Sequence, residues 1–126
     1  MSLNAVLALK NEAGANRSFT TTQVGPTGVT RLDDGTTLST PTMLKIQHST
    51  AGKGDDLSDR HLLQATRVEL DANGIPFTTV VNLTISVPRK SASMASAYDL
   101  VSFLKDLVDT AGAHATELTQ ILQGQS

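Results

Sequence analysis

The amino-acid sequence predicts an α+β fold in which antiparallel strands precede two C-terminal helices. Two observations support this prediction. Residues 77–87, FTTVVNLTISV, follow a two-residue period that is typical of a strand with one buried and one solvated face. Residues 93–109 change to a helical period, with apolar side chains on one face and recurring acidic and serine side chains on the other. A run of strands followed by helices indicates an α+β arrangement.

The remaining elements follow from the same periods and from turn residues. Turn signals such as NEAGAN, DDG, TAGKGDDLSD and DANGIP separate the apolar runs. Strands are expected at residues 4–10, 16–23, 28–33, 42–49, 60–70 and 77–87, and a second helix at 115–123. We interpret the chain as one domain, 1–126, divided into an N-terminal hairpin (1–25), a sheet (26–90) and helices (91–126).

The composition suggests that this domain obtains part of its core from a partner. The 126 residues include one Tyr, three Phe and no Trp, although large rings contribute much of the burial in a typical core. Two short helices also provide little cover for a sheet with strands this long. A twofold partner that exchanges helices would cover the apolar sheet face. The chain has no Cys, no signal-peptide pattern and no apolar run that approaches a membrane span, so no membrane partner is expected.

Charge is unevenly distributed, although the net charge is only −2. Residues 91–126 carry one lysine against four carboxylates. The strands between 42 and 90, without loop 51–59, carry five basic residues against two acidic ones. This division predicts a protein with one basic and one acidic layer.

No catalytic constellation is visible. The acidic loop with Asp55, Asp56 and Asp59 lacks both phosphate-loop spacing and the order of an EF-hand, so we interpret it as a solvated turn. His48 and His61 fall on separate predicted strands, and His114 precedes the second predicted helix; none belongs to a metal-binding motif. We therefore expect no enzyme activity, no cofactor and no metal site.

The polar strand faces are better candidates for function. If the odd-numbered positions of the strands around 45 and 67 share a face, then Lys45 and Gln47 lie near Arg67 and Glu69. The apolar side chains of those strands would occupy the opposite face; they are Leu44, Ile46, Val68 and Leu70. A sheet surface with Lys, Gln, Arg, Asn and Thr offers hydrogen-bond partners for phosphates and base edges.

The order of these parts resembles the coat proteins of the single-stranded RNA bacteriophages, the levivirus family. The segments that carry the resemblance are TMLKIQHS, LLQATRVEL and VNLTISVP, followed by the helix ASAYDLVSFLKDLV. The resemblance spans essentially the whole chain. It implies an N-terminal β-hairpin, a five-stranded antiparallel sheet and two C-terminal helices, joined to a partner as an intertwined dimer with a continuous ten-stranded sheet.

The resemblance also implies a function. Such a protein would be a non-enzymatic capsid protein, found in the virion and assembled in the cytoplasm of a bacterial host. Its partners would be itself, as homodimers in an icosahedral T=3 shell, and the viral single-stranded RNA that the shell packages. Members of the family also bind an RNA hairpin at the replicase start and thereby repress translation.

By position, the resemblance assigns RNA contacts to eight residues. Val80 stands where the family has a base-stacking Tyr, and Ala65 where a polar group is usual, so we expect modest affinity and weak sequence preference. The short loop DANGIP corresponds to the loop that surrounds the symmetry axes of the shell. The eight residues are Lys45, Gln47, Ser49, Ala65, Arg67, Val80, Asn82 and Thr84.

Two other classes of protein remain open on the sequence. One is a small α+β dimer that binds a ligand or catalyses a reaction between its sheet and helices. A pocket with titratable groups would indicate this class, whereas the sequence places Val, Leu and Ile there. The other is an RNA-binding dimer that builds no shell. Electron microscopy of the expressed protein would separate these classes.

Overall fold

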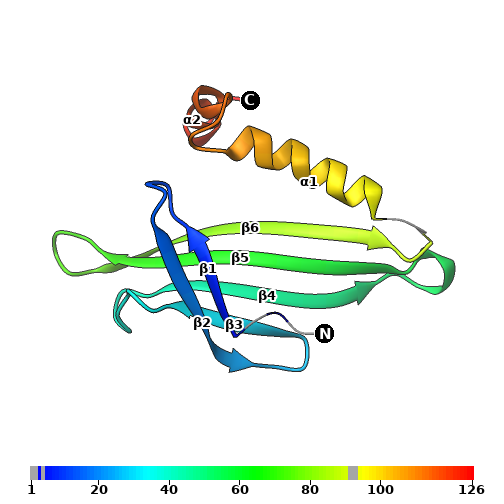
Figure 1. The fold of residues 1–126 in the computed structure, drawn as a ribbon, viewed down its shortest axis with the longest axis horizontal. Helices are drawn as coiled ribbons and strands as arrows, with labels where there is room; N and C mark the ends of the chain where they lie inside the picture. The colour runs from blue at the N-terminus through cyan, green and yellow to red at the C-terminus, as the bar shows by residue number, and fades with distance from the viewer. Residues whose placement is uncertain (1–2, 4, 91–93) are drawn as a thin grey trace. The chain divides into compact units, whose positions relative to one another are not determined.

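The computed structural model describes residues 3, 5–90 and 94–126, which divide into two compact units, 1–90 and 91–126. The first unit is a six-stranded antiparallel sheet in which neighbours along the chain are neighbours in the sheet (Figure 1). Its strands are β1 (Val6–Lys10), β2 (Asn16–Val24), β3 (Gly28–Asp33), β4 (Thr42–Ala51), β5 (Ser58–Leu70) and β6 (Pro76–Pro88), with the short 3-10 helix η1 (Gly54–Asp56) before β5. The second unit contains α1 (Ala95–Val108) and α2 (Ala115–Leu122).

The prediction of a hairpin beside a separate five-stranded sheet is wrong in its strand count. Residues 26–90 hold four strands, β3–β6, and β2 pairs directly with β3. The hairpin strands β1 and β2 therefore complete a single sheet of six strands. Each strand expected from the sequence is present in the described residues, but residue 4 of the first one lies outside them.

Two hairpin loops of the sheet share one construction. In the loop after β1, the Oδ1 atom of Asn11 accepts a hydrogen bond of 3.0 Å from the backbone N–H of Ala15. In the loop after β5, Oδ1 of Asp71 accepts a bond of 2.8 Å from the N–H of Ile75. A glycine with positive φ sits three residues after each of these side chains: Gly14 at 82° and Gly74 at 76°. Both NEAGA and DANGI thus place an Asx side chain and a left-handed glycine where a tight reversal needs them.

The sheet is curled at its N-terminal end. The register shifts between Thr21 and Gln23 of β2, and such irregularities increase local twist. In Figure 1, β1 and β2 run obliquely to the direction of β4–β6. Gly28 permits close approach of β3 to β4, since a Cβ atom there would lie 2.8 Å from the Cα of Gln47 and would collide with the carbonyl oxygen of Ile46. Side chains of β2, β3 and β4 line a groove of 700 Å³ at this curl.

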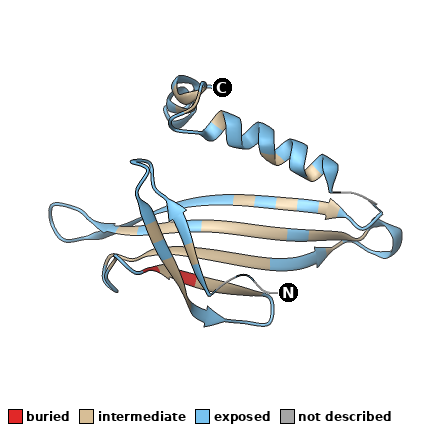
Figure 2. Ribbon diagram, viewed as in Figure 1, coloured by how far each residue is buried: buried red, intermediate tan, exposed pale blue. Residues whose placement is uncertain are grey.

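Burial within one chain is unusual. Among the described residues, no apolar side chain is buried. The only buried residues among them are Arg31 and Asp33, with 2% and 3% of their surface exposed. Figure 2 shows that the buried positions are confined to β3. Apolar residues normally dominate protein interiors. The described part of one chain therefore lacks the apolar core that a stable domain of this length requires.

The helical unit contains the two helices that the sequence predicts. α1 ends at Val108, and Oδ1 of Asp109 accepts a hydrogen bond of 3.0 Å from the N–H of Ala111 in the turn that follows. His114 connects the two helices, because its Nε2 lies 3.3 Å from a carboxylate oxygen of Asp106 and its Nδ1 lies 3.7 Å from one of Glu117. The predicted first residue of the helix, 93, lies outside the described residues.

Candidate nucleic-acid interface

The pairing register sorts the strand residues onto two faces of the sheet. Lys45 is paired with Thr30 on one side and with Gln64 on the other, and Gln64 is paired with Asn82. Residues directly opposite one another in antiparallel strands point to the same side. One face, here called the Lys45 face, therefore carries Gly28, Thr30 and Leu32 of β3; Met43, Lys45, Gln47, Ser49 and Ala51 of β4; Ser58, Arg60, Leu62, Gln64, Thr66, Val68 and Leu70 of β5; and the even-numbered residues 76–88 of β6.

Six of the eight predicted RNA-contacting residues share this face. They are Lys45, Gln47, Ser49, Val80, Asn82 and Thr84. The other two, Ala65 and Arg67, lie on the opposite face, which we call the Leu44 face, because Ala65 is paired with Leu44 and Arg67 with Thr42. The structure does not test the RNA-binding role of any of these side chains, but it separates the eight into two groups.

The expected grouping of Lys45 with Arg67 and Glu69 is therefore wrong. The connection between β4 and β5 sets a register in which odd-numbered residues of β4 oppose even-numbered residues of β5. A shift of one residue moves every side chain of a strand to the other face. Val68 and Leu70 consequently lie on the Lys45 face, whereas Leu44 and Ile46 lie opposite.

The same register places two more polar residues on the Lys45 face, and the sequence did not indicate either of them as part of the site. Gln64 occupies the centre of the row between Lys45 and Asn82, and its Nε2 donates a hydrogen bond of 2.9 Å to Oδ1 of Asn82. Arg60, near the first residue of β5, is paired with Ser49 of β4. The only sequence signal for them was the break in the apolar period of β5 at Gln64. A row of amide and ammonium groups across three strands offers donors and acceptors to a polynucleotide.

Charge differs sharply between the two faces. Within β3–β6, all of which the structure describes, the Lys45 face carries Lys45 and Arg60 and no carboxylate. The acidic strand residues Asp33, Asp59 and Glu69 all lie on the Leu44 face. A cationic surface without acidic neighbours attracts phosphates and does not repel them.

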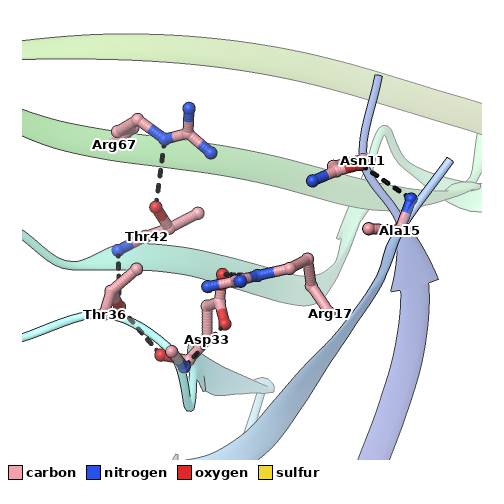
Figure 3. Close-up of polar contacts among 8 residues, drawn as sticks. Asn11, Ala15, Arg17, Asp33, Thr36, Thr42 and Arg67 are labelled. Atoms are coloured by element: carbon pink, nitrogen blue, oxygen red, sulfur yellow. Dashed lines mark hydrogen bonds and ion pairs between the residues drawn. The ribbon is translucent and has the colours of Figure 1, made fainter. Parts of the chain in front are cut away.

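Arg67 takes part in a polar cluster on the Leu44 face (Figure 3). Its Nε donates a hydrogen bond of 3.1 Å to Oγ1 of Thr42. The backbone N–H of Thr42 in turn donates to Oγ1 of Thr36, and that hydroxyl donates to the carbonyl oxygen of Asp33. The carboxylate of Asp33 accepts a bond of 3.0 Å from Nε of Arg17. These interactions join β2, β3, β4 and β5 at one end of the sheet.

The pKa of Asp33 reflects this cluster. Burial alone raises the pKa of the carboxyl group, but the hydrogen bond from the N–H of Gly35 and the nearby guanidinium groups of Arg17 and Arg67 outweigh it. The net effect is a pKa below the ordinary value, so the carboxylate form is favoured in the folded chain. Arg67 thus has an electrostatic partner within its own chain.

Two carboxylates, one in η1 and one at the start of β5, are paired with basic side chains. An oxygen of Asp59 lies 3.1 Å from Nη2 of Arg89, and one of Asp56 lies 3.5 Å from Nζ of Lys90. In the part of the chain that the structure describes, no three His, Asp or Glu side chains gather as a metal site. Neither α1 nor α2 has the length and apolar character needed to cross a bilayer.

Solved structures of phage shell proteins share this fold. The virus-like particle of bacteriophage GQ-907 matches with a TM-score of 0.72 and 14% identity, over 100% of this chain and 96% of the other. The virus-like particle of Beihai levi-like virus 21 matches at 0.68 and 11%, over 99% and 98%. The coat protein of bacteriophage EMS014 matches at 0.63 and 15%, over 90% and 77%.

At the level of sequence, no protein-family model and no curated protein matches. The likeness is therefore one of fold, and it extends over most of the length of both chains. These neighbours are capsid proteins and not enzymes. The chain has the fold of the coat proteins of levi-like bacteriophages.

Proposed function

We propose that this chain is a phage coat protein whose dimers assemble into an icosahedral shell around single-stranded RNA. The observation that carries the proposal is the Lys45 face: in a coat-protein fold, one sheet face presents cations and amides without a carboxylate. That face would be turned inward, toward the genome. The shell would have T=3 symmetry, and the protein would be found in the virion after assembly in the bacterial cytoplasm.

The dimer is supported by what one chain leaves uncovered. β6 is the last strand of the sheet, and it pairs only with β5. The exposed fractions of Tyr98, Leu100 and Phe103 on α1 are 71%, 61% and 65%. A second copy would join its β6 edge to edge and lay its helices over the Leu44 face, as in an intertwined dimer. Two sheets of six strands would then form a continuous sheet of twelve, not ten.

Assembly is tested by expressing the chain alone in bacteria. We expect closed particles of uniform diameter in electron micrographs, with an absorbance near 260 nm that nuclease treatment of opened particles removes. The diameter then reports the triangulation number. Free dimers that stay unassembled at high concentration would contradict the shell, and particles without nucleic acid would contradict packaging.

RNA binding is tested with three matched variants. Lys45→Ala and Arg60→Ala each remove a cation from the Lys45 face, whereas Arg67→Ala removes one from the Leu44 face of the same strand as Arg60. Binding of single-stranded RNA to dimers is measured over a salt series. Removal of one phosphate interaction lowers the slope of log affinity against log salt by about 0.7. We expect this decrease for Lys45→Ala and Arg60→Ala and an unchanged slope for Arg67→Ala.

The reverse pattern, with a lower slope only for Arg67→Ala, would place RNA on the Leu44 face and overturn the assignment. Hairpin recognition is a separate part of the proposal. Val80 is 46% exposed but offers no ring for stacking. We therefore expect the replicase-start hairpin of the same genome to compete only weakly against unstructured RNA, and Val80→Tyr to increase the affinity for both.

A further inference from the structure

Two histidines face each other across neighbouring strands on the Leu44 face. His48 of β4 is paired with His61 of β5, and their Nδ1 atoms are 2.8 Å apart. The rings are nearly perpendicular, with centroids 5.1 Å apart and an interplanar angle of 74°. Within the single chain, His48 is exposed and His61 is half-buried.

A hydrogen bond of this length between two ring nitrogens requires one donor and one acceptor. One imidazole therefore carries its proton on Nδ1, and the other presents the lone pair of its Nδ1. The two nitrogens hold a single proton between them. When a metal ion binds both Nδ1 atoms, the proton of the donor ring moves to Nε2 of the same ring, so that each neutral imidazole presents an Nδ1 lone pair to the metal. Imidazole nitrogen is a preferred ligand of Cu²⁺, Ni²⁺ and Zn²⁺.

The spacing also selects among these ions. Two bonds of about 2.0 Å to nitrogens 2.8 Å apart enclose an angle of about 90° at the metal. That angle matches neighbouring positions in the tetragonal coordination of Cu²⁺ or Ni²⁺ and is narrower than the angle at a tetrahedral Zn²⁺. We propose that His48 and His61 form a cross-strand chelate for a tetragonal transition-metal ion, Cu²⁺ in preference to Ni²⁺ and Zn²⁺.

The rest of the coordination sphere would be water. The next carboxylate on this face of β5, Asp59, is engaged by Arg89 through an ion pair of 3.1 Å. The bound ion would tie β4 to β5 close to the loop that joins them. Since binding favours the folded chain, it would raise stability according to the metal concentration.

The test uses the full chain, purified without a histidine tag, and CuCl₂, NiCl₂ and ZnCl₂ as probes in a non-coordinating buffer near neutral pH. The variants are His48→Asn and His61→Asn, and the matched control is His114→Asn, which changes the histidine of the helical unit. Calorimetric titration gives stoichiometry and affinity. Circular dichroism and thermal melting of each metal-free variant show whether it is folded.

We expect one high-affinity Cu²⁺ per chain, with weaker binding of Ni²⁺ and then Zn²⁺. Removal of either nitrogen eliminates the chelate, so His48→Asn and His61→Asn should weaken Cu²⁺ binding by roughly a hundredfold, while His114→Asn leaves it unchanged. The wild-type chain provides a second readout that needs no variant: nitrogen hyperfine coupling from two imidazoles in the Cu²⁺ electron paramagnetic resonance spectrum. Unchanged Cu²⁺ binding in both folded β-strand variants, weaker binding only in His114→Asn, or coupling to a single imidazole would overturn the site.

Discussion

At the scale of single residues, Asp33 is a buried carboxylate that ties together the curled end of the sheet. It is almost completely buried, and it accepts hydrogen bonds of 3.0 Å from Arg17 and 2.9 Å from the N–H of Gly35. Arg67, which the family resemblance assigned to RNA, contributes to the field that keeps Asp33 ionised. The function of Arg67 that is visible in this structure is thus to complete a cluster within the chain.

We expect Asp33→Asn to lower the free energy of unfolding by about 1.5–3 kcal/mol near neutral pH, because it removes hydrogen bonds to a charged group. The folded-state pKa of Asp33 is lowered, so its contribution is fully present above the ordinary value of 3.8 and disappears as the pH falls through the lower folded value. As the pH falls below about 4, the free energy of unfolding should therefore decrease less for the variant than for the wild type. Urea denaturation over an acidic pH series measures this.

The matched control for this substitution is Asp34→Asn. Asp34 is the next residue in the chain; it is exposed, and its carboxylate accepts a hydrogen bond of 2.8 Å from the hydroxyl of Thr20. Asp34→Asn should lower the free energy of unfolding much less than Asp33→Asn does. Equal losses of stability for the two variants, or an identical acid response of Asp33→Asn and wild type, would show that the buried cluster contributes little.

At the scale of elements, the two Asx loops offer an internal comparison. The carboxylate of Asp71 accepts hydrogen bonds from the N–H groups of both Asn73 and Ile75, at 2.9 and 2.8 Å. The amide of Asn11 accepts one, from Ala15. We expect Asp71→Ala to destabilise the protein by about 1–2 kcal/mol and Asn11→Ala by about half as much, since a net hydrogen bond is worth about 1 kcal/mol. Denaturant midpoints of the two variants provide the measurement, and a larger destabilisation by Asn11→Ala would contradict this account of the loops.

At the scale of the whole molecule, the lack of buried apolar side chains in the described part of one chain predicts that folding and association occur together. If the second copy supplies the missing cover, the melting temperature should rise with protomer concentration, because dissociation and unfolding are then one equilibrium. Thermal melts over a hundredfold range of dilution, under conditions that keep shells dissociated, measure this. Sedimentation velocity over the same range identifies the species. A compact monomer whose melting temperature does not change with dilution would contradict the dimer.

The sequence by itself determined the order and type of the elements. The period of two in residues 77–87 became β6, the helical period of 93–109 became α1, and the Asx and glycine residues of NEAGAN and DANGIP became tight loops. These features depend on interactions between residues close in the chain, where period and turn chemistry are direct physical causes. Lys45 and Gln47 were also placed on one face of their strand correctly, since β4 has the expected alternation.

Only the tertiary structure decided which faces meet. Alternation shows that a strand has two faces, but it does not show which face joins which face of the next strand. That depends on the pairing register, and the register depends on the loop between the strands. The register placed Gln64 and Arg60 on the face of Lys45, turned Arg67 toward Asp33, and brought His48 against His61. Each of these outcomes rests on an interaction between residues distant in the chain, for which period and composition provide no physical cause.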